Sequence, residues 1–539
     1  MNEEHTVDYP SSPSELRGAL PFDWFGLRPS PRPVLSGVRY GAFALVQLAS
    51  VVVLSRLLDP EIFGLMATVQ FFLLFLGQFN ATTFSTSIVQ QEEVTHEQAS
   101  GLFWINCVTG LFLFAIMAGI GYPLAVFIGQ PVLFPVAIVL GCFFFLNALS
   151  AVHMALLERH RAYRRLMLIQ VSGGLFGLAV AVLMAIFGLG IWALVGQTLL
   201  ATLVWIWLSW RLVKWVPGRP ERHVGLKRML RTGIQANADK VMTCLTQNIQ
   251  PLLLAKLAGP LEAGYFNRGQ VVFQRPLNQL LQPLVTLLFP KLATEQAEEN
   301  DDYEPALHKA NFIQAFILLP LLVLFICYSD VLIPLLLGRN FHLAGPIVKW
   351  LAIGFVPMVL VGELPPSPKG YGGQVSPSPK GYGGQGSDTP KGFTGLSKLK
   401  FALGAGLGNR LPVIGLPILI LAMIWAARHG AISVAIVVTA YHWILTFPKA
   451  WLQLKELGLD MSRYLASVEI RGLQVVGLIA LAFFMRQWIS NWSVISNIGL
   501  MVGFLAVAYV LVAASLAAFK DGREILEAAK EWWKGRNNL

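Results

Sequence analysis

Runs of apolar residues, each near the length that crosses a lipid bilayer, recur along the chain and constrain its fold more than any other feature. A bilayer core about 30 Å thick is crossed by roughly 20 apolar residues in a helix, and about fourteen runs approach that length. They lie at 36–58, 63–89, 99–127, 132–156, 166–187, 191–213, 230–256, 262–290, 307–330, 343–362, 401–427, 431–447, 468–488 and 493–518. With 55% hydrophobic and 13% charged residues, the sequence predicts an all-α integral membrane protein.

Two stretches align without a gap at an offset of 200 residues and indicate an internal duplication. Residues 51–64 read VVVLSRLLDPEIFG, and residues 251–264 read PLLLAKLAGPLEAG. Each places a basic residue, Arg56 or Lys256, before a turn proline and a glycine. Six spans separate the starts of the two helices, so both run in the same direction through the bilayer. The duplication therefore predicts two parallel-repeat lobes of six helices, followed by two C-terminal helices.

The net charge of +11 could indicate a nucleic-acid partner, but its placement favours membrane topology instead. When alternate loops are counted from a cytosolic N-terminus, one side receives most of the Lys and Arg, including LERHRAYRR at 157–165. The other side receives few: Arg56, Lys256, Arg339, Arg428 and Arg486. This positive-inside pattern predicts that both termini lie in the cytosol. No nucleic-acid partner is expected.

Composition divides the chain into six parts. We expect a cytosolic tail at 1–33, an N-lobe of helices 1–6 at 34–213, a cytosolic loop at 214–228, a C-lobe of helices 7–12 at 229–455, helices 13–14 at 466–519 and a cytosolic amphipathic tail at 520–539. The first part has no apolar run typical of a signal peptide. Within the C-lobe, 363–400 holds eleven-residue repeats rich in Pro and Gly, which predict a disordered insert.

A cationic strip is predicted near the middle of the eighth span, NRGQVVFQRPLNQLLQP. Helical spacing places five polar residues on one face: Arg268, Arg275, Asn278, Gln279 and Gln282. A charge at a helix centre costs about 2.5–3.5 kcal/mol on insertion scales, so each needs a partner or water. We expect this face to line a cavity for an anionic, hydroxyl-rich substrate, because arginine binds phosphate bidentately and amides bind sugars. Alternatively, Arg275 is a structural residue that bonds the carbonyls freed by Pro276.

A second polar strip lies in the seventh span. Lys240 and Gln247 are candidates for the same cavity, and Asp239 is the one clear carboxylate at comparable depth and a candidate coupling-ion site. Asp239 and Lys240 can also neutralise one another or neighbouring helices. The four cysteines lie in apolar runs without metal-type spacing. No catalytic residue, metal or cofactor is indicated.

Three segments together resemble the Wzx-type polysaccharide flippases of the multidrug/oligosaccharidyl-lipid/polysaccharide exporter superfamily. They are GVRYGAFALVQLASVVVLSRLLDPEIFGLMATVQFF, ALLERHRAYRRLMLIQVSG, and the region from TGIQANADKV to LLFPKL. The resemblance implies a V-shaped pair of lobes in a bacterial inner membrane and alternating access. It implies transport of undecaprenyl-pyrophosphate-linked oligosaccharide to the outer leaflet for O-antigen, capsule or exopolysaccharide synthesis. It also implies that Arg56 serves the cationic lumen, and that membrane lipids, a polysaccharide polymerase and other assembly proteins are partners.

Other functions remain open at this stage. A multidrug exporter or a peptidoglycan-precursor flippase of the same superfamily would share the fold. The multidrug exporter would favour membrane carboxylates, whereas this chain offers mainly Arg and Lys. A polysaccharide polymerase or ligase would need acidic or histidine-containing sites in substantial outer loops, and the predicted outer loops are very short. We therefore expect a transporter and not an enzyme.

Overall fold

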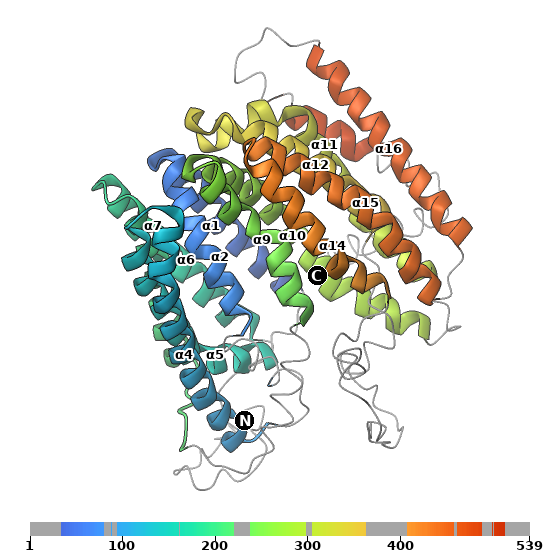
Figure 1. The fold of residues 1–539 in the computed structure, drawn as a ribbon. Coiled ribbons are helices and arrows are strands. Elements are labelled where there is room, and N and C mark those ends of the chain that lie inside the picture. The colour runs from blue at the N-terminus through green and yellow to red at the C-terminus, as the bar shows by residue number, and fades with distance from the viewer. Residues whose placement is uncertain are drawn as a thin grey trace, which may run out of the picture. The chain divides into compact units, whose positions relative to one another are not determined.

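The computed structural model describes residues 34–79, 88, 94–160, 162–219, 238–297, 304–362, 407–457, 461–487, 499 and 501–511. The predicted tail at 1–33, the repeat insert at 363–400 and the tail at 520–539 lie outside these residues, as does most of the predicted loop at 214–228. Over the described residues the chain is almost entirely helical (Figure 1).

Each predicted span overlaps a helix of the described residues. The helices are α1 (Val34–Leu57), α2 (Pro60–Gly77), α4 (His96–Ile128), α5 (Leu133–Arg159), α6 (Tyr163–Ile186), α7 (Ile191–Leu212), α9 (Ala238–Leu257), α10 (Pro260–Ala297), α11 (Glu304–Leu337), α12 (Ala344–Val361), α14 (Leu407–Ala427), α15 (Ala431–Leu457), α16 (Met461–Gln487) and a shorter helix, Met501–Leu511. Eight of them are long and apolar enough to cross a membrane by themselves. The all-helical membrane fold is thus confirmed.

Some helix ends differ from the prediction. Helix α2 ends at Gly77, whereas the predicted span ran to 89, and the Gln78 amide folds back to donate to the Leu74 carbonyl at 3.1 Å. Helix α15 continues to Leu457, ten residues past the predicted 447. Its last turns carry Lys449 and Lys455 and need no apolar residues once they leave the lipid.

The chain divides into two compact units, Met1–Gly264 and Tyr265–Leu539. In the first, α4 packs along α5, α6 along α7, α1 on α6, and α2 on α9. Glycines permit the closest approaches, as small residues do between membrane helices. A Cβ on Gly110 of α4 would lie 2.7 Å from the Phe144 carbonyl oxygen of α5, and one on Gly177 of α6 would lie 2.8 Å from the Gln197 carbonyl oxygen of α7.

The second unit is built on α11, α12 and α15, with α14 against α15 and α16 against α11. A Cβ on Gly354 of α12 would lie 2.9 Å from the Cα of Thr439 on α15. The Thr439 hydroxyl donates to the Trp350 carbonyl at 2.6 Å, and the Trp443 indole donates to the Ile353 carbonyl at 3.0 Å. Polar side chains of α15 thus bond to the backbone of α12, as is common where water is absent.

The segment that leaves α7 folds back over the start of α4 and the last turns of α5. The Trp215 indole donates to His96 at 3.1 Å, and the Trp215 carbonyl lies 3.2 Å from Nε2 of His153. Further along, the Gly218 amide donates to the Ser100 hydroxyl at 2.9 Å, and its carbonyl accepts from the Trp104 indole at 2.9 Å. We call residues 213–219 the strap. It covers the buried cluster around Phe103 and Val152.

The two aligned stretches of the sequence meet each other in the structure. Residues 59–64 and 259–264, here called the repeat turns, each lead through a proline into the first turn of a helix. A Cβ on Gly64 would overlap the carbonyl oxygen of Pro260, and a Cβ on Gly264 would overlap that of Pro60. Such reciprocity is the mark of two segments related by a local two-fold axis, and it supports the internal duplication.

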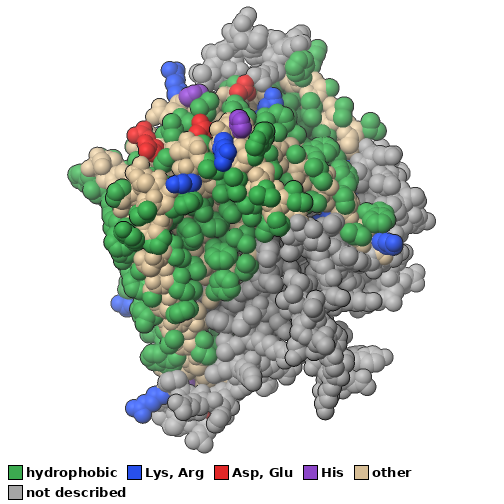
Figure 2. Space-filling model, in the orientation of Figure 1, with side chains coloured by type: hydrophobic (Ala, Val, Ile, Leu, Met, Phe, Trp, Pro, Cys, Tyr) green, Lys and Arg blue, Asp and Glu red, His purple; other side chains and the backbone are tan. Residues whose placement is uncertain are grey.

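The surface suits lipid. Figure 2 shows hydrophobic side chains over most of the described part of the face in view, with charged side chains and His toward its ends. Val108, Phe187 and Leu421 are among many large apolar side chains that are more than two-thirds exposed. A soluble protein rarely exposes so much contiguous apolar surface. The protein is a multi-pass membrane protein.

Candidate functional site

One face of α10 packs against its own unit. Phe266, Phe273 and Leu277 are fully or almost fully buried along this face. The Phe273 ring makes edge contacts with Phe325 of α11 and Phe355 of α12, with ring centroids 5.4 Å and 5.8 Å apart. Gly269 brings α10 close to α12, because a Cβ there would lie 3.3 Å from the Ala344 carbonyl oxygen.

The two arginines of the predicted strip occupy the opposite side of the helix. At 100° per residue, Arg268 and Arg275 lie roughly half a turn from the line of Phe266, Phe273 and Leu277. Both are half-buried, and they lie near enough for their like charges to repel each other. Arranged two turns apart, they form a short cationic stripe that faces away from α11 and α12. The stripe carries fixed positive charge of the kind that binds phosphate oxygens.

The amide residues predicted to continue this stripe belong to the same helix. Asn278 is exposed. Gln279 and Gln282 lie within α10, but their side chains are outside the description. Helix α10 runs unbroken from Pro260 to Ala297, so all five predicted positions keep the register that placed them on one face.

The predicted residues of α9 belong to the first compact unit, whereas the α10 stripe belongs to the second. Gln247 is exposed, and the side chains of Asp239 and Lys240 are outside the description. Asn248 and Gln250 donate back to the carbonyls of Cys244 and Thr246, one turn earlier. These two amide side chains are thus used within the helix itself.

The two basic residues of the duplicated stretches have different surroundings. Arg56 is exposed in the last turn of α1. Lys256 donates to the Phe127 carbonyl at 2.5 Å, and its ammonium lies 4.8 Å from the Phe127 ring centroid. Because Phe127 lies in the last turn of α4, Lys256 caps the negative end of that helix and fixes α9 against it.

Arg471 is a buried cation that the sequence pattern did not single out. It is 3% exposed, and one of its guanidinium nitrogens donates to the Leu360 carbonyl at 2.6 Å, close to the end of α12. The sequence signal that could have identified Arg471 is its position just inside an apolar span. The sequence alone does not show which carbonyl Arg471 contacts. In the structure this contact fixes α16 to α12.

Other chemistry is not evident among the described residues. The four cysteines are free thiols. Among the residues that the structure describes, no three His, Cys, Asp or Glu side chains come together as metal ligands. What the described geometry offers is positive charge presented from a membrane helix.

Comparison with known proteins places this chain in a family. A family model described as polysaccharide biosynthesis protein matches residues 53–346. The chain is 23% identical over 331 residues to the lipopolysaccharide biosynthesis protein WzxC of Escherichia coli K12, covering 59% of this chain and 66% of WzxC. It is 22% identical over 317 residues to the succinoglycan biosynthesis transport protein ExoT of Rhizobium meliloti, covering 58% of this chain and 63% of ExoT.

A third relative is the teichuronic acid biosynthesis protein TuaB of Bacillus subtilis, 25% identical over 286 residues that cover 52% of this chain and 58% of TuaB. The chain thus matches less than two thirds of the length of each of these relatives.

Two solved structures show the same fold. The inward closed conformation of the lipid II flippase MurJ matches with a TM-score of 0.58 at 10% identity, over 90% of this chain and 99% of MurJ. An inward-facing multidrug resistance transporter of the MATE family matches with a TM-score of 0.53 at 14% identity, over 79% of this chain and 98% of that one. Since the family model spans more than half of the chain, the protein belongs to the polysaccharide biosynthesis protein family.

Proposed function

We propose that the protein is a flippase that moves undecaprenyl-pyrophosphate-linked oligosaccharide repeat units from the inner to the outer leaflet of a bacterial cytoplasmic membrane. The observation that carries the proposal is the pair Arg268 and Arg275, held two turns apart on the face of α10 opposite its packing face. The translocated repeat units are used to build a surface polysaccharide such as O-antigen, capsule or exopolysaccharide. The names of WzxC, ExoT and TuaB support this class of product.

The charge of the stripe selects the substrate. Each arginine in a membrane span costs about 2.5–3.5 kcal/mol on insertion scales, so a sequence that retains two of them on one face benefits from a compensating anion. A pyrophosphate offers several oxygens to two guanidinium forks. Asn278, Gln279, Gln282, Gln247 and Lys240 are proposed to contact the sugars and the remaining phosphate oxygens, and Arg56 to attract the substrate at a membrane surface.

The repeat turns supply a means of alternating access. Their glycine-to-carbonyl contact is reciprocal and sterically close, so it can hold two helix pairs together on one side of the membrane. Parting these turns would open that side, as in the rocking of two repeats about a central site. Asp239 is proposed as the site of a coupling ion.

The same superfamily contains two rival activities. A multidrug exporter binds cations, which the arginine stripe would repel. A peptidoglycan-precursor flippase would use the same pyrophosphate chemistry, and the likeness to MurJ, at 10% identity, is one of fold alone. We place both termini in the cytosol, with a polysaccharide polymerase and other assembly proteins as partners at the outer face, and assign no enzymatic activity.

Deleting the gene tests the proposal. The surface polysaccharide should disappear, while its lipid-linked repeat unit accumulates on the inner leaflet, and the intact gene in trans should reverse both effects. If the deletion instead causes lysis with accumulated peptidoglycan precursor, the second activity holds. Normal polysaccharide with increased drug sensitivity would favour the exporter.

A further inference from the structure

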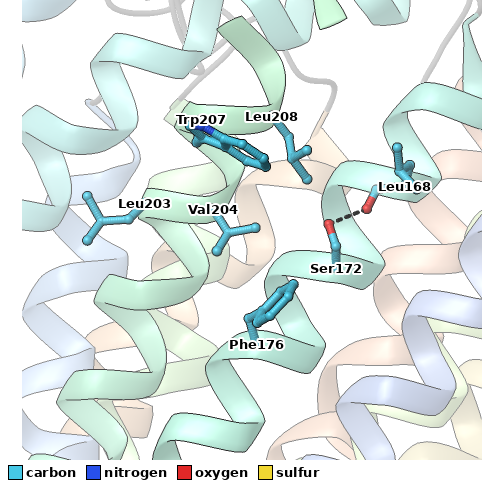
Figure 3. A pocket seen from close by; sticks show the side chains of 7 residues that line it. All are labelled: Leu168, Ser172, Phe176, Leu203, Val204, Trp207 and Leu208. Atoms are coloured by element: carbon cyan, nitrogen blue, oxygen red, sulfur yellow. Dashed lines mark hydrogen bonds between the residues drawn. The ribbon is translucent and has the colours of Figure 1, made fainter. Parts of the chain in front are cut away.

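A groove of about 510 Å³ lies between α6 and α7 of the first compact unit. Seven residues line it: Leu168, Ser172 and Phe176 from α6, and Leu203, Val204, Trp207 and Leu208 from α7 (Figure 3). Ser172 contributes the one side-chain hydroxyl, which donates to the Leu168 carbonyl within its own helix (Figure 3). The walls are therefore apolar in effect.

The groove has the length of one leaflet. Leu168 and Phe176 are eight residues apart, which is about 12 Å along a helix. One leaflet of a bilayer core about 30 Å thick contributes about half of that thickness. Leu168, Phe176 and Trp207 are each about half exposed or more, so the groove opens outward to lipid and not into the protein.

Both lining stripes end in an arginine at the same end of the groove. On α6 the spacing of four residues runs from Phe176 through Ser172 and Leu168 to Arg164. On α7 the same spacing runs from Leu203 through Trp207 to Arg211. Arg164 and Arg211 are exposed, and the Arg211 guanidinium carbon lies 5.7 Å from the centroid of the Trp207 ring. The two arginines lie about one helical turn beyond the apolar lining.

The groove is preformed by close packing of its two helices. A Cβ on Gly177 would lie 2.8 Å from the Gln197 carbonyl oxygen, which shows how closely the backbones approach. At the basic end, a guanidinium nitrogen of Arg165 donates to the Leu212 carbonyl at 3.0 Å and fixes the start of α6 to the end of α7. A ligand entering such a groove loses little to ordering of the protein.

We propose that this groove is a binding site for an anionic glycerophospholipid of the leaflet at the basic ends of α6 and α7. One acyl chain lies between Phe176 and Trp207, and Arg164 and Arg211 hold the phosphate. The charge of the rim selects the occupant, since two arginines disfavour a lipid without net negative charge. The site would distinguish phosphatidylglycerol from phosphatidylethanolamine, whose own ammonium group neutralises its phosphate.

Native mass spectrometry of the full-length protein, released from vesicles of equal phosphatidylglycerol and phosphatidylethanolamine, tests the site. Wild type should retain one phosphatidylglycerol in preference to phosphatidylethanolamine. A basic residue near the membrane surface contributes about a five-fold preference, so Arg164→Gln with Arg211→Gln should reduce it about 25-fold. Ser172→Trp, which fills the groove, should remove the bound lipid while both arginines remain.

Lys455→Gln is the matched control. Lys455 lies 5.3 Å from the Trp451 ring at the end of α15, the same cation-over-tryptophan arrangement outside the groove. This variant should retain phosphatidylglycerol as wild type does. Arg164→Lys with Arg211→Lys keeps the charge and should retain most of the preference, which covers the case in which the Gln variant fails to fold.

Three results would overturn the proposal. The first is equal retention of the two lipids by wild type. The second is unchanged retention of phosphatidylglycerol by the folded Gln and Trp variants. The third is a loss of phosphatidylglycerol from the Lys455→Gln control as large as that from the Gln variant. When a polyprenyl phosphate is added to the same vesicles, its retention in place of phosphatidylglycerol would also overturn the proposal, because the groove would then belong to the carrier lipid.

Discussion

Replacing Gly64 with alanine should force the repeat turns apart. A methyl group at this position would overlap the Pro260 carbonyl oxygen. It would also lie 2.8 Å from the Pro260 carbonyl carbon and 2.9 Å from the Gly264 nitrogen. All three are backbone atoms, so no side chain can rotate away to make room.

The size of the effect follows from these distances. Ordinary contact begins near 3.4 Å, so the turns must separate by at least about half an ångström, and further at the carbonyl oxygen. Overpacking of this kind costs about 1–3 kcal/mol, which is about a 5- to 150-fold shift between the joined and parted states. The better helix propensity of alanine offsets at most about 1 kcal/mol.

The shift can be measured as a distance distribution. Spin labels at Glu61 and Leu261, which are exposed and equivalent in the two repeats, report the separation in a background without the native cysteines. Gly64→Ala should move the population to longer distances. Gly77→Ala in the same helix should not, because a Cβ there meets nothing within 4 Å.

Gly264→Ala should act as Gly64→Ala does. The double variant should show a smaller population shift than the sum of the shifts in the two single variants, since one methyl group already parts the turns. An unchanged distance distribution and unchanged thermal stability in Gly64→Ala would refute the reasoning.

Two further outcomes are expected. Trp215→Ala should lower the free energy of unfolding by about 3 kcal/mol or more, because it removes a buried indole that contacts His96, Phe103 and His153. Thermal unfolding in detergent measures this, and Trp425→Ala, where the side chain is 65% exposed, is the control. Arg219→Cys should escape an impermeant maleimide in intact cells and react after permeabilisation, because Lys and Arg on this side predict a cytosolic position. Labelling of Arg219→Cys in intact cells would show that the assigned orientation in the membrane is wrong.

Much of the fold could be predicted from the sequence because lipid imposes a length and a composition on each helix. The turn at Pro60 follows from local chemistry and was predicted. Helix ends outside the lipid, such as Leu457, could not be predicted because nothing there requires apolar residues.

Contacts between segments far apart in the sequence were harder to predict. An alignment can suggest a duplication, but it does not show that Gly64 and Gly264 meet each other's prolines. The strap could not be foreseen, because Trp215 and Gly218 follow a span and look like ordinary interfacial residues. Helical spacing places Arg275 on the face opposite the packing residues of α10, and its role stays a prediction because it depends on a substrate that spacing does not reveal.

Transport by an Arg275→Ala variant tests the central claim most directly. Purified protein in vesicles is given a pyrophosphate-linked oligosaccharide in one leaflet, and its arrival in the other leaflet is measured with a lectin or glycosidase. Lys349→Ala, which removes an exposed cation from α12, is the control and should transport normally. Arg275→Ala should insert and fold at normal abundance and fail to transport. Arg275→Lys should recover only part of the rate, because lysine keeps the charge and loses the bidentate fork. Full transport by a normally abundant Arg275→Ala protein would contradict the account and move the substrate site away from α10.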